Sequence, residues 1–580
     1  MREVDRLTTE RYGIPSILLM ENAAHAVARV ISEKLGGSVK GKSILILCGK
    51  GNNGGDGAAL ARILSDFGGV VEVTLFGRVA ETNGDARTNF NRLLTTASTD
   101  FNKKGDLYFE ETPLMDYWVH AVGTGIRKFD IFVDALFGTG LTKPLDSPFS
   151  YLPGVIRDQW SETATVSGEP AIVVSVDIPS GLDSDSSDIP DIHITADVTV
   201  TFTSPKAANV LSPAYRSNGE LVIAEIGSPF DLILEQESGL FLGEKNDARR
   251  WLEQTTFSPG DYKNKRGHAL IVAGSEDYSG AAVMCGNSAM RSGVGLTTLL
   301  VSASCKVEVA SRVIPEVIVR TLSETDGDVD SDAFAANADV FRQADSILVG
   351  PGLKATDKGV ERLVREIVEN RKVPVVVDAG ALAFLNSPPY KGGVAPASGD
   401  GVVLFRGEAT SVVSDKFPVA HLENHPVGET PPPLVRKVRS CVPLILTPHE
   451  GEFMRLVGTE DRSVIEDRVA AVREFAVANN VILVLKGERV LIGAPDGRVV
   501  VNPTGNSGLG KAGNGDTLAG ILAGFVAQAV KFEIDIFETV VAAVYVAGMA
   551  GDVAERKFGK RVMTASDVRD CLVEVFAELE

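Results

Sequence analysis

Residues 43–68, SILILCGKGNNGGDGAALARILSDFG, decide the fold of the first part of the chain. A short apolar run is followed by a segment with five glycines and then by apolar residues at helical spacing. This order predicts a buried strand, a glycine-rich turn and a helix. Such glycines permit positive φ angles and close backbone approach, so that free amides can face a phosphate. The segment is neither the GxGxxG fingerprint nor a P-loop ending in GK[ST]. A purely structural turn is the alternative, but it would not require Asn52, Asn53 and Asp56 among the glycines.

The alternation of short apolar runs with helical segments continues along the chain. In the first half the runs are 43–47, 70–76, 131–135 and 172–176, and in the second half they are 269–273, 346–349, 375–377, 444–446 and 482–485. Strands of a parallel sheet are covered on both faces, and they therefore read as continuous apolar runs. The sequence predicts the α/β fold class, with two tandem three-layer α/β domains.

The alternation pauses near residues 227–249, where Gly, Ser and Pro precede a charged run. A chain of 580 residues exceeds the size of one hydrophobic core. We therefore place domains at 1–227 and 249–580, with a linker at 228–248. Two further segments, 146–170 and 386–433, are expected to be surface loops.

Composition limits the partners and the compartment. The formal net charge is −20, which argues against non-specific binding to nucleic acid or an anionic membrane, because either would need a basic surface. The five cysteines show no CxxC spacing, which argues against a zinc site or a disulfide framework and for a reducing compartment. Residues 1–15 lack an apolar h-region, and no stretch approaches about 18 uninterrupted apolar residues. We expect a cytoplasmic protein with no nucleic-acid or membrane partner.

Two aspartates stand at predicted strand ends in the first half. Asp134 lies in VDALFGTGL, residues 133–141, and Asp177 lies in VDIPSG, residues 176–181, with Ser180 close behind. Ligands of open parallel sheets bind beyond the carboxyl ends of the strands, so these turns are expected to converge. Their oxygens suit a hard cation, and a spare carboxylate suits an acid or base. An aspartate at a strand end can also be a simple helix N-cap.

Together with residues 1–24, these motifs resemble the NAD(P)HX epimerase domain, also called the YjeF N-terminal domain, over about residues 1–227. The resemblance implies a Rossmann-like fold, K⁺ held by Asn53, Asp134 and Ser180, and Asp177 as the catalytic group at the hydrated nicotinamide. It also implies a substrate site formed by two loops, whose residues are Asn52, Asn53, Gly54, Gly55, Asp56, Gly138, Thr139, Gly140, Leu141, Thr142, Lys143 and Pro144.

A second constellation lies near the end of the chain. Residues 506–520, NSGLGKAGNGDTLAG, open an alanine-rich helical segment. The N-terminus of such a helix stabilises phosphoryl oxygens, and Asp516 stands where it can take a proton from an attacking hydroxyl. A single Gly-Asp pair would also fit an ordinary helix cap. It is accompanied here by glycine-rich or polar turns after other predicted strands, at residues 350–353, 447–453 and 486–487.

These residues resemble the NAD(P)HX dehydratase domain, or YjeF C-terminal domain, of the ribokinase-like superfamily, over about residues 249–580. The resemblance implies Asp516 as the catalytic base. It implies contacts to the hydrated nicotinamide from Gly352, Pro448, His449, Glu450, Gly451, Glu452 and Phe453. It implies ADP binding by Lys486, Gly487, Glu488, Arg489, Val490, Asn506, Ser507, Gly508, Leu509, Gly510, Lys511, Ala512, Gly513, Asn514 and Gly515.

The second half departs from that family pattern at two places. The stretch that is commonly DADALN reads DAGALA here, residues 378–383, with Gly380 in place of an aspartate and Ala383 in place of an asparagine. The stretch that is usually TPHPGE reads TPHEGE, residues 447–452, with Glu450 in place of proline.

The resemblance implies a bifunctional repair enzyme, an isomerase joined to a hydro-lyase. The first domain would interconvert R- and S-NAD(P)HX, and the second would dehydrate the S epimer to NAD(P)H with ADP or ATP. The implied cofactors are K⁺ and Mg²⁺, the substrates are NADHX and NADPHX, and we expect a homo-oligomer. The rival hypothesis is a ribokinase-like small-alcohol kinase with a non-catalytic ligand-binding N-terminal domain, because fold does not fix function.

Overall fold

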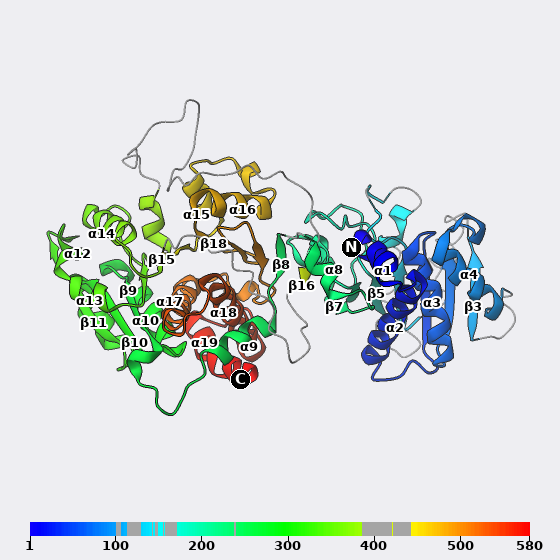
Figure 1. Ribbon diagram of the computed structural model, residues 1–580, viewed down its shortest axis with the longest axis horizontal. Coiled ribbons are helices and arrows are strands. Elements are labelled where there is room, and N and C mark those ends of the chain that lie inside the picture. The colour runs from blue at the N-terminus through cyan, green and yellow to red at the C-terminus, as the bar shows by residue number, and fades with distance from the viewer. Residues whose placement is uncertain are drawn as a thin grey trace. The chain divides into compact units, whose positions relative to one another are not determined.

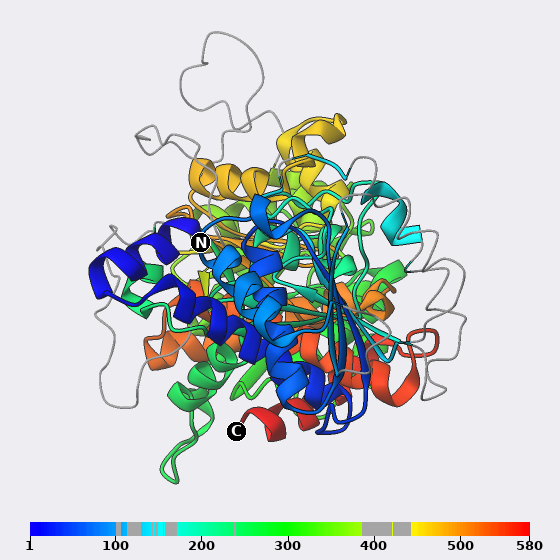
Figure 2. The same cartoon turned by 90° about the vertical axis from the view of Figure 1, so that its right-hand side faces the viewer.

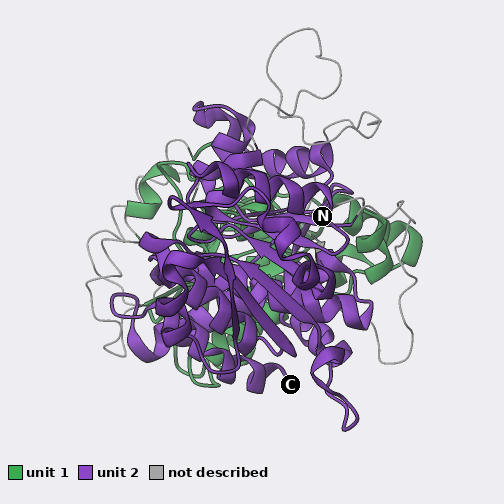
Figure 3. Cartoon of the chain, turned by 90° about the vertical axis from the view of Figure 1, so that its left-hand side faces the viewer, with its two compact units in different colours: residues 1–238, 414–421 green, residues 239–413, 422–580 purple. Residues whose placement is uncertain are grey.

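The computed structural model describes residues 1–99, 106–112, 129–141, 143–145, 149–154, 156, 171–236, 239–385, 420–421 and 442–580. The chain divides into two compact units. Unit 1 comprises Met1–Ser238 with Ser414–His421, and unit 2 comprises Gly239–Val413 with Leu422–Glu580 (Figures 1 and 3). Of the predicted loops, all of 386–433 except residues 420–421 and most of 146–170 lie outside the described residues.

Unit 1 is built on one parallel sheet with the strand order β3-β2-β1-β4-β5-β6-β7. The strands are β1 (Ser43–Cys48), β2 (Val70–Leu75), β3 (Leu107–Glu111), β4 (Ile131–Ala135), β5 (Ile172–Val176), β6 (Val198–Phe202) and β7 (Glu220–Ala224). The strand order reverses between β1 and β4. In such sheets ligands bind at this point, outside the carboxyl ends of the strands.

Both faces of the unit 1 sheet are covered. Along β1, Ile44 and Ile46 pack into one core and Leu45 and Leu47 into the other, which explains the continuous apolar run. Figure 2 shows the blue helices along one face. The described helices are α1 (Arg2–Tyr12), α2 (Ser16–Lys34), α3 (Asn52–Asp66), α4 (Gly84–Thr96), α7 (Ala207–Val210) and α8 (Phe230–Glu235).

Unit 2 contains a longer sheet with the order β11-β10-β9-β14-β15-β17-β18-β19-β20-β8. Its strands are β8 (Leu240–Leu242), β9 (His268–Val272), β10 (Leu296–Ser302), β11 (Ile318–Leu322), β14 (Ser346–Val349), β15 (Val375–Val377), β17 (Leu444–Leu446), β18 (Ile482–Leu485), β19 (Leu491–Gly493) and β20 (Val499–Val501). Pairing is parallel from β11 to β18 and antiparallel for β18–β19 and β19–β20. The prediction of two tandem α/β layers is confirmed.

The helices of unit 2 follow its strands. They include α9 (Lys245–Gln254), α10 (Ser279–Arg291), α11 (Lys306–Arg312), α14 (Lys358–Glu369), α15 (Glu450–Val457), α16 (Arg468–Asn479), α17 (Asn514–Phe532), α18 (Ile536–Phe558), α19 (Ala565–Asp570) and α20 (Leu572–Leu579). Within the described part of the chain, α18 alone is long and apolar enough to cross a membrane, and 78% of its apolar window is buried in unit 2. It is therefore best explained as a core helix.

The division between the units lies within the predicted linker 228–248, but helices and strands of both units occupy much of that segment. The division falls between Ser238 and Gly239. Helix α8 belongs to unit 1, where Glu235 pairs with Arg11 of α1 at 2.6 Å. Strand β8 pairs with β20, and α9 begins at Lys245, so both are part of the unit 2 fold. The glycine-rich and charged composition suggested a connecting segment, but α8, β8 and the start of α9 lie within it.

Candidate active sites

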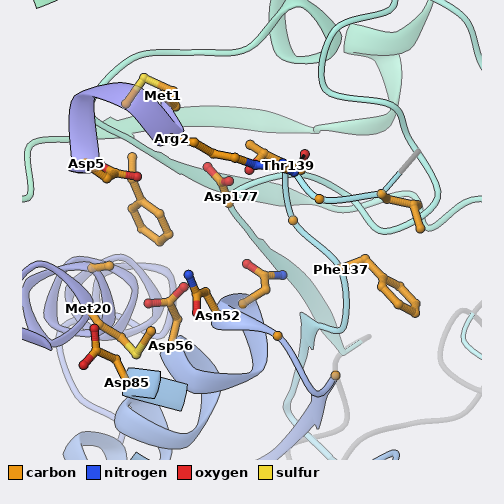
Figure 4. A pocket seen from close by; sticks show the side chains of 18 of the residues that line it. Met1, Arg2, Asp5, Met20, Asn52, Asp56, Asp85, Phe137, Thr139 and Asp177 are labelled. Carbon is orange, nitrogen blue, oxygen red and sulfur yellow. Dashed lines mark hydrogen bonds between the residues drawn. The ribbon is translucent and has the colours of Figure 1, made fainter. Parts of the chain in front are cut away.

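Unit 1 has a cavity of about 590 Å³ at the strand ends where the order reverses. Its wall brings together residues from α1, α3, the turn after β4, and the ends of β5 and β6. Figure 4 shows Asp56 and Asp177 entering this space from different elements. The lining includes these predicted site residues: Asn52, Asn53, Asp56, Gly138, Thr139, Gly140, Leu141 and Asp177.

The predicted glycine-rich turn is mostly the first turns of α3, which begins at Asn52. None of the segment's five glycines is among the positive-φ residues, so that part of the prediction is wrong. Close approach explains four of them instead, and Gly51 is the exception, since nothing lies within 4 Å of its Cβ position. A Cβ on Gly49 would lie 2.0 Å from the Leu136 carbonyl oxygen, and one on Gly54 would lie 1.8 Å from that of Gly49. Gly54 and Gly55 pack inside the unit and are not among the cavity residues.

Asp177 follows β5 and is held in the left-handed region, with φ at 69°. Only 9% of it is exposed. Its Oδ1 accepts hydrogen bonds from Lys206 Nζ at 2.5 Å and from Thr201 Oγ1 at 3.1 Å. The buried ammonium of Lys206 is thus the ion-pair partner of the Asp177 carboxyl group at the cavity wall.

Lys206 is the functional residue that the sequence analysis missed. It is buried after β6, and its ammonium also donates to Thr201 Oγ1 at 2.9 Å and to the Phe202 carbonyl at 3.1 Å. Nearby, Thr203 has a φ of 64°, which is strained for a β-branched residue. Strained backbone held by its surroundings is a feature of functional sites. The available signal was a lysine four residues after the strand-like stretch VTVTF, residues 198–202.

Asp134 and Ser180 form a buried pair beneath this wall. Ser180 Oγ donates to Asp134 Oδ1 at 2.6 Å, and Ser180 N and Ser175 Oγ donate to Oδ2 at 2.8 and 2.9 Å. Burial raises the pKa of Asp134, and these hydrogen bonds oppose the rise. Asp134 accepts from Leu136 N, so it orders a turn and is not a helix N-cap.

The predicted K⁺ ligands are thus partly assembled. No hydrogen bond links Asn53 to Asp134 or Ser180 among the described residues, and Asn53 Nδ2 is buried without a partner. The donor set is nevertheless oxygen-rich and contains a buried carboxylate that no Lys or Arg pairs among the described ion pairs. That chemistry fits a monovalent cation, whose charge would offset the desolvated carboxylate.

The predicted loop 138–144 is divided between cavity and surface. Gly138, Thr139, Gly140 and Leu141 line the cavity, and the Thr139 carbonyl accepts from Arg2 Nη2 of α1 at 2.7 Å. Lys143 and Pro144 are exposed and are not among the lining residues. Thr142 lies outside the described residues.

In unit 2, Asp516 lies in the first turn of α17 behind Gly513, which has a φ of 91° and gives the helix no side-chain cap. Burial raises the pKa of Asp516 to about 6, nearby Asp378 adds to the rise, and Lys486 opposes it. A carboxylate with a pKa in this range, at the positive end of a 19-residue helix, suits a general base beside phosphoryl oxygens.

Lys486 follows β18 and is tied to acidic residues. Its Nζ lies 2.7 Å from Asp378 Oδ1 and 3.9 Å from Glu452 Oε2. Asp378 follows β15, so the ends of two strands on either side of β17 supply the cation and the anion. The structure therefore brings Lys486, Asp378 and Glu452 together beside Asp516.

The predicted glycines of unit 2 serve close backbone approach. A Cβ on Gly350 would lie 1.8 Å from the Asp378 carbonyl oxygen, and one on Gly352, where φ is 67°, would lie 2.7 Å from that of Tyr278. Gly380 is restricted as well, because its Cβ would lie 2.5 Å from the Leu353 carbonyl oxygen. The backbone of this chain thus accommodates glycine, and not aspartate, at position 380.

His449 and its neighbours have clear structural roles. His449 caps α15: its Nδ1 accepts from Gly451 N and Glu452 N at 3.0 and 3.3 Å, and Glu452 Oε2 accepts from His449 N at 2.9 Å. Glu450 occupies the first helical position, where proline is favoured and a carboxylate also complements the helix dipole. Phe453 is 1% exposed and its ring packs against Phe475, so the predicted ligand contact from this residue would have to come from its backbone.

Several side chains of the predicted nucleotide-binding segment form hydrogen bonds within the protein. Lys511 Nζ donates to the carbonyls of Arg561 and Met563 at 2.7 and 2.8 Å. Asn506 Nδ2 donates to the Gly551 carbonyl, and its Oδ1 accepts from Gly508 N, both at 2.9 Å. These bonds fix the backbone that precedes α17. Any phosphate contact from this stretch is therefore expected from its amides.

Comparison with known proteins agrees with this division. A family model described as YjeF-related protein N-terminus matches residues 16–208, and one described as NAD(P)H-hydrate dehydratase matches residues 269–404 and 433–573. A protein of Moorella thermoacetica called bifunctional NAD(P)H-hydrate repair enzyme Nnr is 33% identical, covering 100% of this chain and 96% of the relative. One of the same name from Thermofilum pendens is 31% identical, covering 99% and 95%.

A solved structure is similar to part of this chain. A Bacillus subtilis structure described as ADP/ATP-dependent NAD(P)H-hydrate dehydratase co-crystallized with ATP/Mg²⁺ is 26% identical, with a TM-score of 0.42. It covers 59% of this chain and 99% of its own length.

Proposed function

Because this chain belongs to the family of bifunctional NAD(P)H-hydrate repair enzymes, we propose that unit 1 interconverts the epimers of hydrated NADH and NADPH and that unit 2 dehydrates one of them. The observation that carries the proposal is the 33% identity over the whole chain. In support, each unit holds one reactive carboxylate at a strand or helix end, Asp177 in unit 1 and Asp516 in unit 2.

In unit 1 the reaction inverts the carbon that bears the added hydroxyl. Asp177, oriented by Lys206 and Thr201, stands at the cavity wall and can accept a proton from a hydroxyl or water at that carbon. Glycine backbones at 49 and 54 keep the neighbouring turns close, so the ring can be held against the carboxylate.

In unit 2 the hydroxyl must become a better leaving group. Asp516 takes its proton as the hydroxyl attacks the terminal phosphoryl group of ADP or ATP. Phosphate then leaves from the ring carbon, and loss of a ring proton restores the dihydropyridine. The amides of the first turn of α17 stabilise phosphoryl oxygens, and Lys486 lies close enough to Asp516 to act on its charge. Mg²⁺ is expected to enter with the nucleotide.

The proposal is tested by supplying both epimers with ADP, Mg²⁺ and K⁺ and following the absorbance of reduced nicotinamide. Complete conversion supports both activities, whereas a plateau after one epimer is consumed contradicts the proposed role of unit 1. A small-alcohol kinase would instead release a stable phosphorylated alcohol without that absorbance. The full-length relatives do not favour the kinase.

As the pH is lowered, the rate of dehydration is expected to fall at a higher pH than it would if the base were an aspartate of ordinary pKa. Because burial raises the pKa of Asp516 to about 6, the basic carboxylate form is lost as the pH falls through that value. The kcat/KM for the S epimer should therefore decline about tenfold per pH unit below pH ~6. Rates that stay constant down to pH ~4.5, measured on enzyme that remains folded, would exclude Asp516 as the base.

Potassium is proposed to act only in unit 1, held by Asn53, Asp134 and Ser180. When bound, it would offset the buried carboxylate charge and order the turn after β4. Replacing K⁺ by choline at constant ionic strength is expected to slow epimerisation by roughly tenfold (~1.4 kcal/mol) and to lower the melting temperature of unit 1, with dehydration of the S epimer unchanged. An equal loss in both reactions would contradict this site.

A homo-oligomer and a cytoplasmic location stay predictions from the sequence. Size-exclusion chromatography with light scattering tests the first, and localisation of the tagged chain in cells tests the second.

A further inference from the structure

The unit 1 cavity contains a second carboxyl group that the mechanism above does not use. Asp56 lies in α3, is 8% exposed, and lines the same cavity as Asp177. Within the described part of the chain, its carboxyl group makes no ion pair or hydrogen bond. Its two oxygens are not among the inaccessible, unpartnered side-chain atoms of the described residues, so both remain accessible. It is thus a nearly buried polar group whose accessible partner would be a ligand.

A structural role does not explain Asp56. Helix α3 begins at Asn52, so Asp56 stands beyond the first turn, whose free amides a carboxylate could cap. Aspartate is also a poor residue for a helix interior, and burying it without a partner costs stability. Its position beside the cavity is more readily explained by a chemical role than by a contribution to folding.

The two carboxyl groups of the cavity have opposite surroundings. Asp177 is paired with the buried ammonium of Lys206. Asp56 is surrounded mainly by acids: burial raises its pKa well above the ordinary value, Asp177 and Asp5 raise it further, and only Lys206 opposes. Asp85 of α4 and Arg2 of α1 are further charged residues on the cavity wall. One group therefore suits a proton donor and the other a proton acceptor.

Asp56 and Asp177 also approach the cavity from different directions (Figure 4). Asp56 comes from α3 and Asp177 from the end of β5, and Figure 4 shows them entering the cavity from different sides. Inversion at one carbon requires a bond to break on one face of the ring and to form on the other. A donor and an acceptor on separate walls provide for both events.

We propose that Asp56 is a catalytic residue of the epimerase, the general acid that protonates the departing hydroxyl while Asp177 serves as the base. The inference rests on the proposed epimerase function. The C–O bond breaks as the ring nitrogen lone pair forms an iminium, and the proton of Asp56 leaves with the hydroxyl as water. A second water then adds to the opposite face, its C–O bond forms, and its proton passes to Asp177. Exchange with solvent resets both carboxyl groups.

The test supplies the R epimer alone, with ADP, Mg²⁺ and K⁺, so that reduced nicotinamide appears only after epimerisation. Asp56→Asn keeps the size of the side chain and cannot donate the proton. Its kcat for epimerisation is expected to fall by roughly 10²-fold or more, with KM nearly unchanged and dehydration of the S epimer within about twofold of wild type. Asp56→Glu should recover part of the rate. The matched control is Asp66→Asn, an exposed residue of the same helix, expected to leave both reactions unchanged.

The outcomes separate the two proposals. If wild type does not epimerise the hydrate, the proposed function fails regardless of Asp56. If wild type is active and Asp56→Asn keeps its rate within about threefold, the acid role is wrong and the function stands. Asp56→Asn removes a buried carboxyl group, so a melting temperature equal to or above that of wild type will verify folding. In H₂¹⁸O each inversion should introduce one labelled oxygen, and inversion that keeps the original oxygen would overturn the step.

Discussion

Asp516→Asn is expected to lower kcat for dehydration of the S epimer by roughly 10³- to 10⁴-fold while leaving epimerisation by unit 1 intact. Asparagine keeps the shape of the first turn of α17 but cannot accept the hydroxyl proton. The measurement is the rate at which reduced nicotinamide appears from the pure S epimer with ADP. Glu533→Gln, an exposed residue at the other end of α17, is the matched control and should retain wild-type rates.

The stability of Asp516→Asn provides a control for its folding. Because the folded-state pKa of Asp516 is raised to about 6, its ionised form costs folding free energy above that pH, and the cost is lost as pH falls toward the ordinary aspartate value. At pH 8 the free energy of unfolding of Asp516→Asn should therefore exceed that of wild type by up to about 3 kcal/mol, a limit that solvent screening reduces. The difference should vanish near pH 4. A folded, stabilised variant with a wild-type dehydration rate would remove Asp516 from the mechanism.

Asp177→Asn is expected to lower epimerisation by roughly 10³-fold with dehydration unchanged. The amide cannot accept a proton, and the pairing with the buried ammonium of Lys206 is lost. With mixed epimers and excess ADP, conversion should stop once the S epimer is consumed, apart from spontaneous epimerisation. Asp191→Asn, an exposed residue after β5, is the control.

Loss of folding is the competing explanation for that result, because Asp177→Asn leaves Lys206 buried and unpaired. The double variant Asp177→Asn, Lys206→Met removes both charges and avoids that penalty. It should fold and remain inactive. Epimerisation at near the wild-type rate by the folded double variant would show that Asp177 is not the base.

The sheets could be predicted from the sequence because parallel strands covered on both faces give continuous apolar runs. Residues 43–47 and 482–485 were correctly placed in strands for this reason. Asp177 could be singled out because it follows an apolar run at the end of a predicted strand, where ligands of such sheets bind. Asp516 could be singled out because it follows a glycine-rich turn at the start of a helix.

The pairs within the sites could not be predicted in the same way. Lys206 contacts Asp177 across 29 residues, and Lys486 contacts Asp378 across 108. Only the packing of separate strand ends creates these pairs, and no local pattern encodes them. The same limit applies to Phe453, whose motif suggested a ligand contact but whose ring fills the core. It also applies to Gly49, Gly54, Gly55 and Gly57, which serve close packing and have no positive φ angles.

The central claim is that each unit has its own reactive carboxylate and that the two reactions need not share one chain. Mixing the Asp177→Asn protein with the Asp516→Asn protein, and supplying both epimers with ADP, Mg²⁺ and K⁺, tests this directly. Each variant alone should fail to convert the mixture completely, whereas the two together should convert both epimers to reduced nicotinamide. A mixture that still stops after one epimer, or yields no reduced nicotinamide, would contradict the assignment of the two sites.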